Sequence, residues 1–165
     1  MNSNERIKIR FFVSYAHKDD EYAMDFIEEF KDMSAPSKKY EYEFWQDTEI
    51  LPGEQWETEI RQALNVCEMG LLLISPAFLG SKFIGEKELP RFIGERGKPI
   101  ITVMLKMVNL KRHNLKGLDR NQIFRLRVDG VQEPKSFAQC SKDQKTDYVF
   151  ELFDRVEKSL DKIFS

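Results

Sequence analysis

The sequence predicts an α/β protein: a flavodoxin-like three-layer sandwich with a five-stranded parallel sheet in the order 2-1-3-4-5 and helices on both faces. Apolar, strand-like runs alternate along the chain with segments of helical periodicity. Three of these runs stop at a polar or acidic cluster that leads into a helical pattern. The 165 residues, 41% hydrophobic and 33% charged, suit one domain spanning residues 1–165, with its core at about 7–164.

The first half of the chain carries two predicted strand–helix pairs. Residues 7–15 begin with alternating side chains and end in an apolar run, which is typical of a strand entering a buried sheet. Asp19 and Asp20 supply the acidic start of a helix, and residues 34–39 break it. The second strand is expected at about Tyr42–Trp45. The apolar faces of the two helices comprise Ala23, Phe26, Ile27, Phe30 and Met33, and then Trp56, Ile60, Ala63 and Leu64.

The second half supplies three further strands and the last helix. The strands are predicted at Gly70–Ser75, 99–105 and Ile123–Val128, with an irregular or briefly helical basic stretch between the last two. Gly85 and Pro90 weaken a helix after the third strand, so that helix is expected to start near Lys87 rather than at Ser81. Thr146 is expected to cap the last helix.

Composition excludes several classes of partner. The net charge of −2, from 26 basic and 28 acidic side chains, gives no general attraction to nucleic acid. Cys67 and Cys140 form no CxxC motif, and His17 and His113 lie far apart, so we expect no metal site. With only two cysteines, we expect a reduced, cytoplasmic setting. The longest apolar stretch, GLLLISPAFLG, is shorter than the ~20 residues of a membrane span, and we expect no membrane partner.

Charge is unevenly distributed along the chain. Residues 18–32 carry seven acids and residues 106–127 carry seven bases. Two interpretations remain open. The blocks are solvated faces, as charge runs usually are, or they are complementary patches on different sides of one domain, suited to head-to-tail self-association.

The motifs of common cofactor chemistry are missing. There is no GxGxxG, no GxxxxGK[ST] and no GxSxG nucleophile elbow. Ser75 and Pro76 end the third strand where a phosphoacceptor domain needs an aspartate, and AHKDD after the first strand is too charged for a flavin phosphate loop. What remains is a cleft at the carboxyl ends of the strands, lined by carboxylates and aromatic side chains.

Three segments carry a family resemblance. VSYAHKD after the first strand, FWQDTEILPGE after the second and SPAFLGSKFIGEKEL after the third resemble the signature boxes of Toll/interleukin receptor (TIR) domains of the bacterial type. The resemblance covers about Ile7 to Phe164. It implies cleavage of the nicotinamide–ribose bond of NAD⁺, to ADP-ribose or a cyclic product, activated by self-assembly with other TIR domains in bacterial defence or stress signalling. NAD⁺ is then the substrate, no separate cofactor is needed, and an unidentified sensor domain or protein is implied.

The resemblance also assigns site residues. Catalytic TIR domains have a glutamate after the third strand, followed by an aliphatic residue, and Glu88 matches that position better than Glu86 does. The resemblance places the substrate pocket at Phe12, Ser14, Tyr15, Trp45, Asp47, Phe83 and Ile84. Leu51, Pro52 and Gly53 match a loop that covers the nucleotide and takes part in assembly. At Ile84 relatives often carry a tryptophan that can stack on nicotinamide.

Simpler explanations stand beside these assignments. Glu88 could be a surface carboxylate at a helix start, Asp47 a loop cap, and Ser14 a partner for backbone groups at a strand end. Trp45 is expected to pack in the core. The alternative function is a non-catalytic TIR scaffold that mediates homotypic interaction in signalling.

Overall fold

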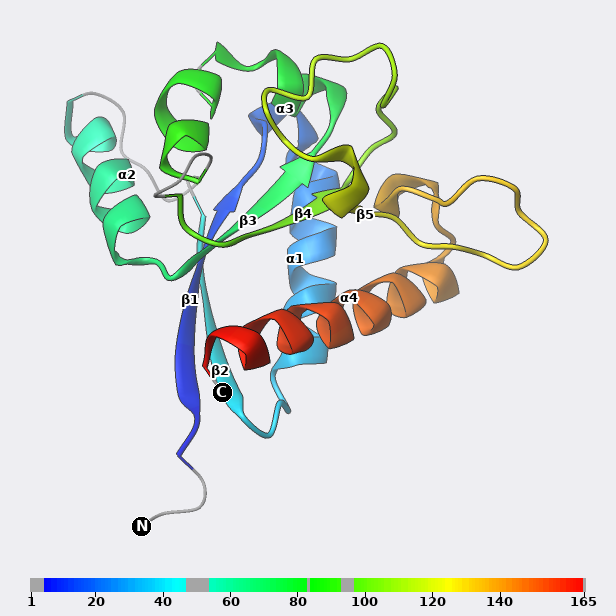
Figure 1. Ribbon diagram of the computed structural model, residues 1–165, viewed down its shortest axis with the longest axis horizontal. Coiled ribbons are helices and arrows are strands. Elements are labelled where there is room, and N and C mark those ends of the chain that lie inside the picture. The colour runs from blue at the N-terminus through cyan, green and yellow to red at the C-terminus, as the bar shows by residue number, and fades with distance from the viewer. Residues whose placement is uncertain (1–4, 47–53, 83, 93–96, 165) are drawn as a thin grey trace.

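An all-parallel, five-stranded sheet in the order β2-β1-β3-β4-β5 forms the centre of the computed structural model (Figure 1). The structure describes residues 5–46, 54–82, 84–92 and 97–164. The predicted fold class and strand order are confirmed. The strands are β1 (Ile7–Ser14), β2 (Tyr40–Gln46), β3 (Met69–Ile74), β4 (Ile100–Met104) and β5 (Ile123–Phe124).

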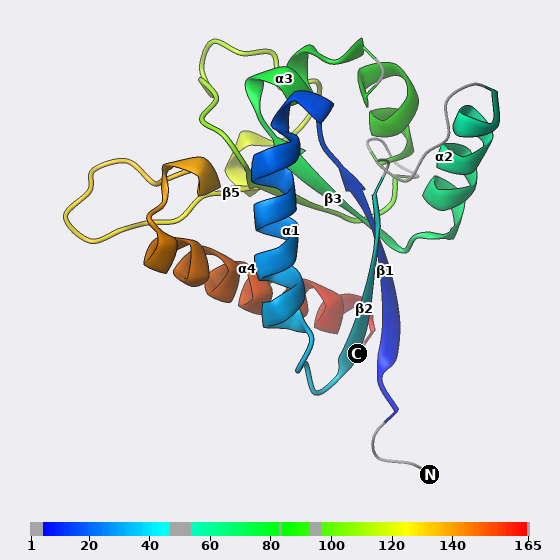
Figure 2. The same ribbon diagram turned by 180° about the vertical axis from the view of Figure 1, so that it is seen from behind.

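Helices cover both faces of this sheet (Figures 1 and 2). One face packs against α1 (Asp20–Ser34) and α4 (Lys142–Ile163). The other packs against shorter elements: α2 (Glu54–Val66), α3 (Pro76–Gly80), the π-helical turn η3 (Ile84–Glu88) and the 3₁₀ turn η4 (Leu89–Arg91). Within the four described ranges no helix is long and apolar enough to cross a membrane. The remaining 3₁₀ turns are η1 (His17–Asp19), η5 (Arg120–Gln122) and η6 (Phe137–Gln139).

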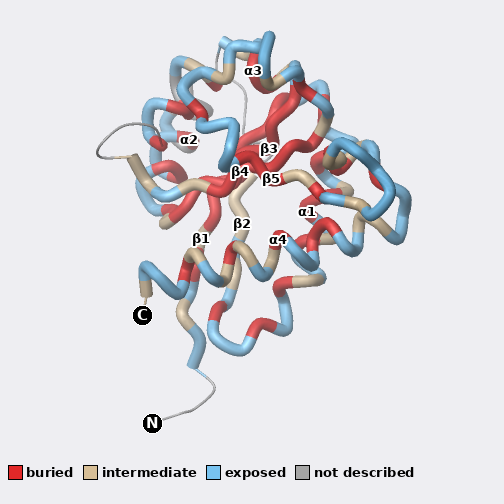
Figure 3. The backbone as a smooth tube through the Cα atoms, turned by 45° about the vertical axis from the view of Figure 1, so that its right-hand side comes forward, coloured by how far each residue is buried: buried red, intermediate tan, exposed pale blue. Residues whose placement is uncertain are grey.

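The two faces hold separate apolar cores. Side chains alternate along a strand, so Phe11 and Val13 of β1 enter the α1/α4 core, whereas Phe12 enters the core on the α2 face. β3 is buried along its whole length because it lies between β1 and β4 with helices on both sides. Figure 3 shows the central strands buried and the connecting loops largely exposed.

Two predicted boundaries, one of a helix and one of a strand, were wrong. The last helix begins at Lys142, not at Thr146, because Ser141 and Gln144 form a reciprocal capping box that starts it one turn earlier. β5 ends at Phe124 rather than Val128, since Leu126 instead bridges antiparallel to Lys135.

The segment after β3 also differs from expectation. Helical structure begins at Pro76, with Ser75 as the N-cap, and not near Lys87. Proline is well tolerated in the first turn of a helix because its missing N–H has no intrahelical partner there. The chain then breaks at Ser81 and resumes as the η3 turn, so Gly85 lies inside a helical turn.

Candidate functional site

The candidate site lies between two neighbouring strands whose following connections run to opposite faces of the sheet. β1 and β3 pair in the middle of the sheet, with Ser14 opposite Leu72. The connection after β1 leads to α1 on one face, and the connection after β3 leads to α3 and η3 on the other. Open α/β proteins bind ligands at such a switch point, outside the carboxyl ends of the strands.

Glu88 ends the η3 turn and is fully buried. Its neighbours explain this, because Ile84 and Leu89 pack into the core on the α2 face and draw the turn inward. Glu86, in the same turn, is exposed. The carboxyl group of Glu88 is therefore shielded from bulk solvent, and the surface-carboxylate interpretation does not fit its burial. Its catalytic role stays a prediction.

Ser14, the last residue of β1, is also fully buried. By strand alternation its side chain lies on the same face of the sheet as Phe12. Its Oγ has no hydrogen-bond partner within the described ranges. A buried hydroxyl without a partner costs about 1–3 kcal/mol, so such a group needs an explanation. Ser14 is therefore a polar group that the described part of the fold does not satisfy.

Three aromatic rings pack together on the α2 face of the sheet. The Phe12 ring lies between Trp45, at a centroid distance of 5.0 Å, and Phe92, at 5.9 Å. Phe92 in turn covers Gly70 of β3, where a Cβ would come within 2.7 Å of the ring. Phe12 and Phe92 are buried, and Trp45 is partly exposed. Trp45 therefore packs on the core, as expected, while keeping one part accessible.

The structure separates the other predicted pocket residues. Ile84 lies in the same core as Phe12, whereas Tyr15 points into the α1/α4 core on the opposite face and is 1% exposed. His17 is exposed, with a side-chain exposure of 61%. The predicted site residues Asp47, Leu51, Pro52, Gly53 and Phe83 lie outside the described residues.

Sequence reasoning missed a polar cluster at the same edge of the sheet. Asp19 does not cap α1 with its side chain; its carboxylate accepts a hydrogen bond from Ser75 Oγ and is 2% exposed. Lys106 Nζ, after β4, lies 3.5 Å from the same carboxylate. Ser75 Oγ also accepts from Phe78 N at 3.0 Å and so caps α3. The cluster fixes the starts of α1 and α3 to each other, and its signal in the sequence was a serine ending an otherwise apolar strand.

The same cluster bears on the two charge blocks. Lys106 pairs with Asp19, and Lys145 Nζ lies 2.7 Å from Asp25. Two acids of the 18–32 block are therefore neutralised within the chain. The other acids of the block are exposed or partly exposed on α1 and stay available to a partner.

No group of three or more histidine, cysteine or carboxylate side chains that could hold a metal ion occurs among the residues that the structure describes. Cys67 is buried, and burial raises the pKa of its thiol to about 11, so it is not an activated nucleophile. The α2-face side of the sheet thus holds two buried polar side chains, the Ser14 hydroxyl at the end of β1 and the Glu88 carboxyl group in the η3 turn.

Comparison with known proteins agrees with the resemblance of the three segments. The family model described as TIR domain matches residues 11–141. That match covers the second half of β1, from Phe11 to Ser14, the strands β2 to β5, and Glu88. A search of curated proteins finds no match to the chain.

Proposed function

Because the chain belongs to the TIR-domain family, we propose that it is an NAD⁺ nucleosidase that cleaves the bond between nicotinamide and ribose, with Glu88 as the catalytic carboxylate. The observation that carries the proposal is the complete burial of Glu88 in the segment that follows β3. TIR domains include such enzymes and also non-catalytic scaffolds, so family membership alone does not choose between them.

The reaction asks little of the protein beyond one well-placed negative charge. Loss of nicotinamide generates an oxocarbenium-like ribose, as in glycoside cleavage. A carboxylate held in a water-poor site stabilises that positive charge more strongly than it would in water. The leaving nicotinamide is cationic in NAD⁺ and departs neutral, so no general acid is required.

Ser14 supplies a complementary polar contact. Its buried Oγ, without a partner among the described residues, can donate to or accept from a ribose hydroxyl. Such a bond would satisfy the serine only when the substrate is present. In this proposal Ser14 therefore orients the sugar, and Glu88 faces the carbon at which the bond breaks.

Nicotinamide release from NAD⁺ tests the proposal. Glu88→Gln keeps the shape of the side chain and removes its charge, so we expect release to fall by about 10²–10³-fold. Glu86→Gln is the matched control, because Glu86 lies in the same turn but is exposed, and it should retain wild-type release. Equal release from the wild type and Glu88→Gln would remove Glu88 from the mechanism.

The second candidate is a scaffold that signals by self-association, as TIR domains generally self-associate. The exposed acids of α1 and the bases of residues 106–127 favour it. Exposed charge pairs are screened by salt, so this function predicts oligomers that dissociate as ionic strength rises, measured by light scattering. Oligomers with no nicotinamide release at any protein concentration would favour the scaffold, whereas release that grows with concentration would indicate an enzyme activated by assembly.

A further inference from the structure

β2 lies at the edge of the sheet, and none of the described strands covers its outer side. At its start, Tyr40 N donates to Ser37 Oγ at 3.3 Å, and Tyr40 O accepts from Arg6 Nη1 at 3.3 Å. Both backbone groups of Tyr40 therefore point away from β1. In a parallel pair alternate residues face the same side, so the N–H and C=O groups of Tyr42 and Phe44 point outward as well. No hydrogen bond reaches those four groups from any residue that the structure describes.

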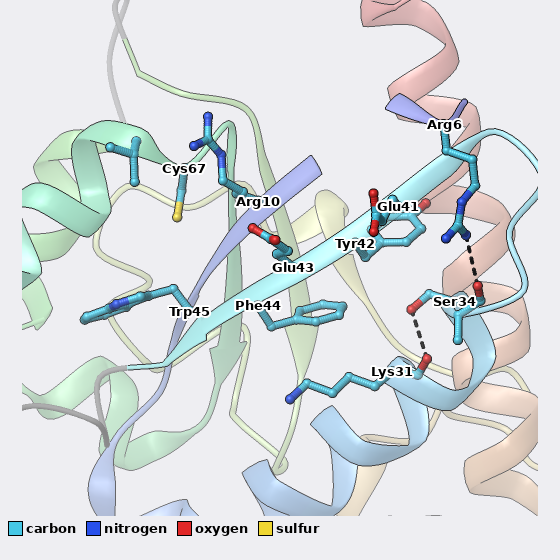
Figure 4. A pocket seen from close by; sticks show the side chains of 12 residues that line it. Arg6, Arg10, Lys31, Ser34, Glu41, Tyr42, Glu43, Phe44, Trp45 and Cys67 are labelled. Carbon is cyan, nitrogen blue, oxygen red and sulfur yellow. Dashed lines mark hydrogen bonds between the residues drawn. The ribbon is translucent and has the colours of Figure 1, made fainter. Parts of the chain in front are cut away.

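A groove of about 730 Å³ runs along this edge (Figure 4). The end of α1 contributes Lys31 and Ser34 to one side; Val66, the last residue of α2, and Cys67, which follows it, contribute to the other. Figure 4 shows Trp45 and Arg6 toward opposite ends of the strand. Residues from both faces of β2 line the groove, which therefore follows the outer edge of the strand, where an added strand would lie.

The side chains of β2 define what this groove can accept. Tyr42 and Phe44 lie on the face toward α1 and pack against its core, whereas Glu41 and Glu43 are exposed on the other face. A strand laid beside β2 would place apolar side chains next to the aromatic pair. Its alternate side chains would lie next to the two glutamates, where basic groups are favourable.

The inner neighbour of β2 already follows this pattern. β1 pairs Lys8 with Glu41 and Arg10 with Glu43 in register, and Lys8 Nζ lies 3.2 Å from a Glu43 carboxylate oxygen. Ile7 and Ile9, which alternate with these two basic residues along β1, turn to the apolar face. One alternating apolar–basic strand thus already fits one side of β2.

We propose that the outer edge of β2 is a docking surface for an extended segment of a partner protein in which apolar and basic residues alternate. The segment adds a strand to the sheet through the backbone groups of Tyr42 and Phe44. A second copy of this chain does not fit through its own β2, because the glutamates of the two strands would then lie side by side and repel each other.

The test uses the full chain and two short peptides. One is an acetylated, amidated peptide with the sequence IKIRF, which copies residues 7–11; the control is IEIEF. Amide hydrogen exchange is followed by NMR. With IKIRF we expect slower exchange at the Tyr42 and Phe44 amides and no change at Glu41 and Glu43, whose amides already face β1.

A charge reversal provides the second measurement. In Glu41→Lys/Glu43→Lys we expect the dissociation constant of IKIRF to rise about tenfold and IEIEF to become the tighter ligand. If the double variant does not fold, the single variant Glu41→Lys, at an exposed position, should change the dissociation constants of the two peptides in the same direction. The proposal would be overturned if IKIRF slowed amide exchange uniformly or not at all, or if both peptides bound the wild type equally. The glutamates would then serve only to prevent aggregation through the edge strand.

Discussion

Gly70 offers a sharp test of how β3 supports the segment that carries Glu88. A Cβ at this position would lie 2.7 Å from Phe92 Cε1 and 2.9 Å from Cδ1, about 0.7 Å inside the 3.4 Å at which ordinary contact begins. The Phe92 ring is 4% exposed and packs on Phe12 at a centroid distance of 5.9 Å, so it cannot rotate freely out of the way. Gly70→Ala should therefore force the ring and the η4 turn away from the sheet.

Two opposing effects set the size of the change. Overpacking a core costs about 1–3 kcal/mol. Replacing glycine by alanine, without a clash, stabilises a protein by about 0.4–1 kcal/mol by restricting the unfolded chain. We expect the clash to dominate, so Gly70→Ala should lower the free energy of unfolding by about 1–2 kcal/mol. At this chain length that corresponds to a fall in melting temperature of about 2–8 °C.

The assay is urea unfolding of four proteins: the wild type, Gly70→Ala, Phe92→Leu and the double variant. Leucine lacks the ring atoms that the new methyl group would meet, so Gly70→Ala should become neutral or stabilising in the Phe92→Leu background. If Gly70→Ala lowers stability by the same amount in both backgrounds, contact with the ring is not the cause and our account of Gly70 is wrong.

Two further predictions concern the end of α2. Lys98 Nζ donates to the carbonyl groups of Leu64, Asn65 and Cys67 and so caps the helix. Lys98→Met should therefore lower the free energy of unfolding by about 1–2 kcal/mol. The control, Lys82→Met at an exposed site, should leave the free energy of unfolding unchanged. Burial raises the pKa of Cys67 from 9.0 to about 11, so the unfolded chain releases this proton first and stability should fall as pH rises through that interval. Urea titrations at pH 8 and pH 10.5 under reducing conditions should show a smaller fall in Cys67→Ala, and an equal fall would exclude Cys67 as its source.

The sheet could be predicted because its strands have strong local signals. β3 is apolar at every position and β1 is apolar from Phe11 to Val13, a pattern that is typical of buried parallel strands. The break at residues 34–39 likewise matched the end of α1 at Ser34. Each of these signals lies within a few residues of the structure that it determines.

The features that escaped prediction depend on residues far apart in the sequence. Asp19 has a reasonable local role as a helix start, but folding brings it to Ser75, 56 positions away, and a buried hydrogen bond replaces the cap. Gly85 and Pro90 argue locally against helix, yet the packing of Ile84 and Leu89 on the α2-face core holds the segment in π and 3₁₀ turns. The family resemblance identifies Glu88 as the candidate catalytic residue, but only the tertiary packing shows that it is buried.

The two faces of the sheet differ in how they are held, and this difference bears on function. The α1/α4 face is covered by helices of 15 and 22 residues with continuous hydrogen bonding. The opposite face is covered near the switch point by α3, η3 and η4, none longer than five residues, so few regular backbone bonds hold Glu88 in place. Such segments open at lower free energy than long packed helices do. The catalytic proposal therefore places the Glu88 carboxylate on the face of the sheet that is easier to deform. There a substrate, or a neighbouring domain in an assembly, could shift the η3 turn without disturbing the α1/α4 core on the opposite face.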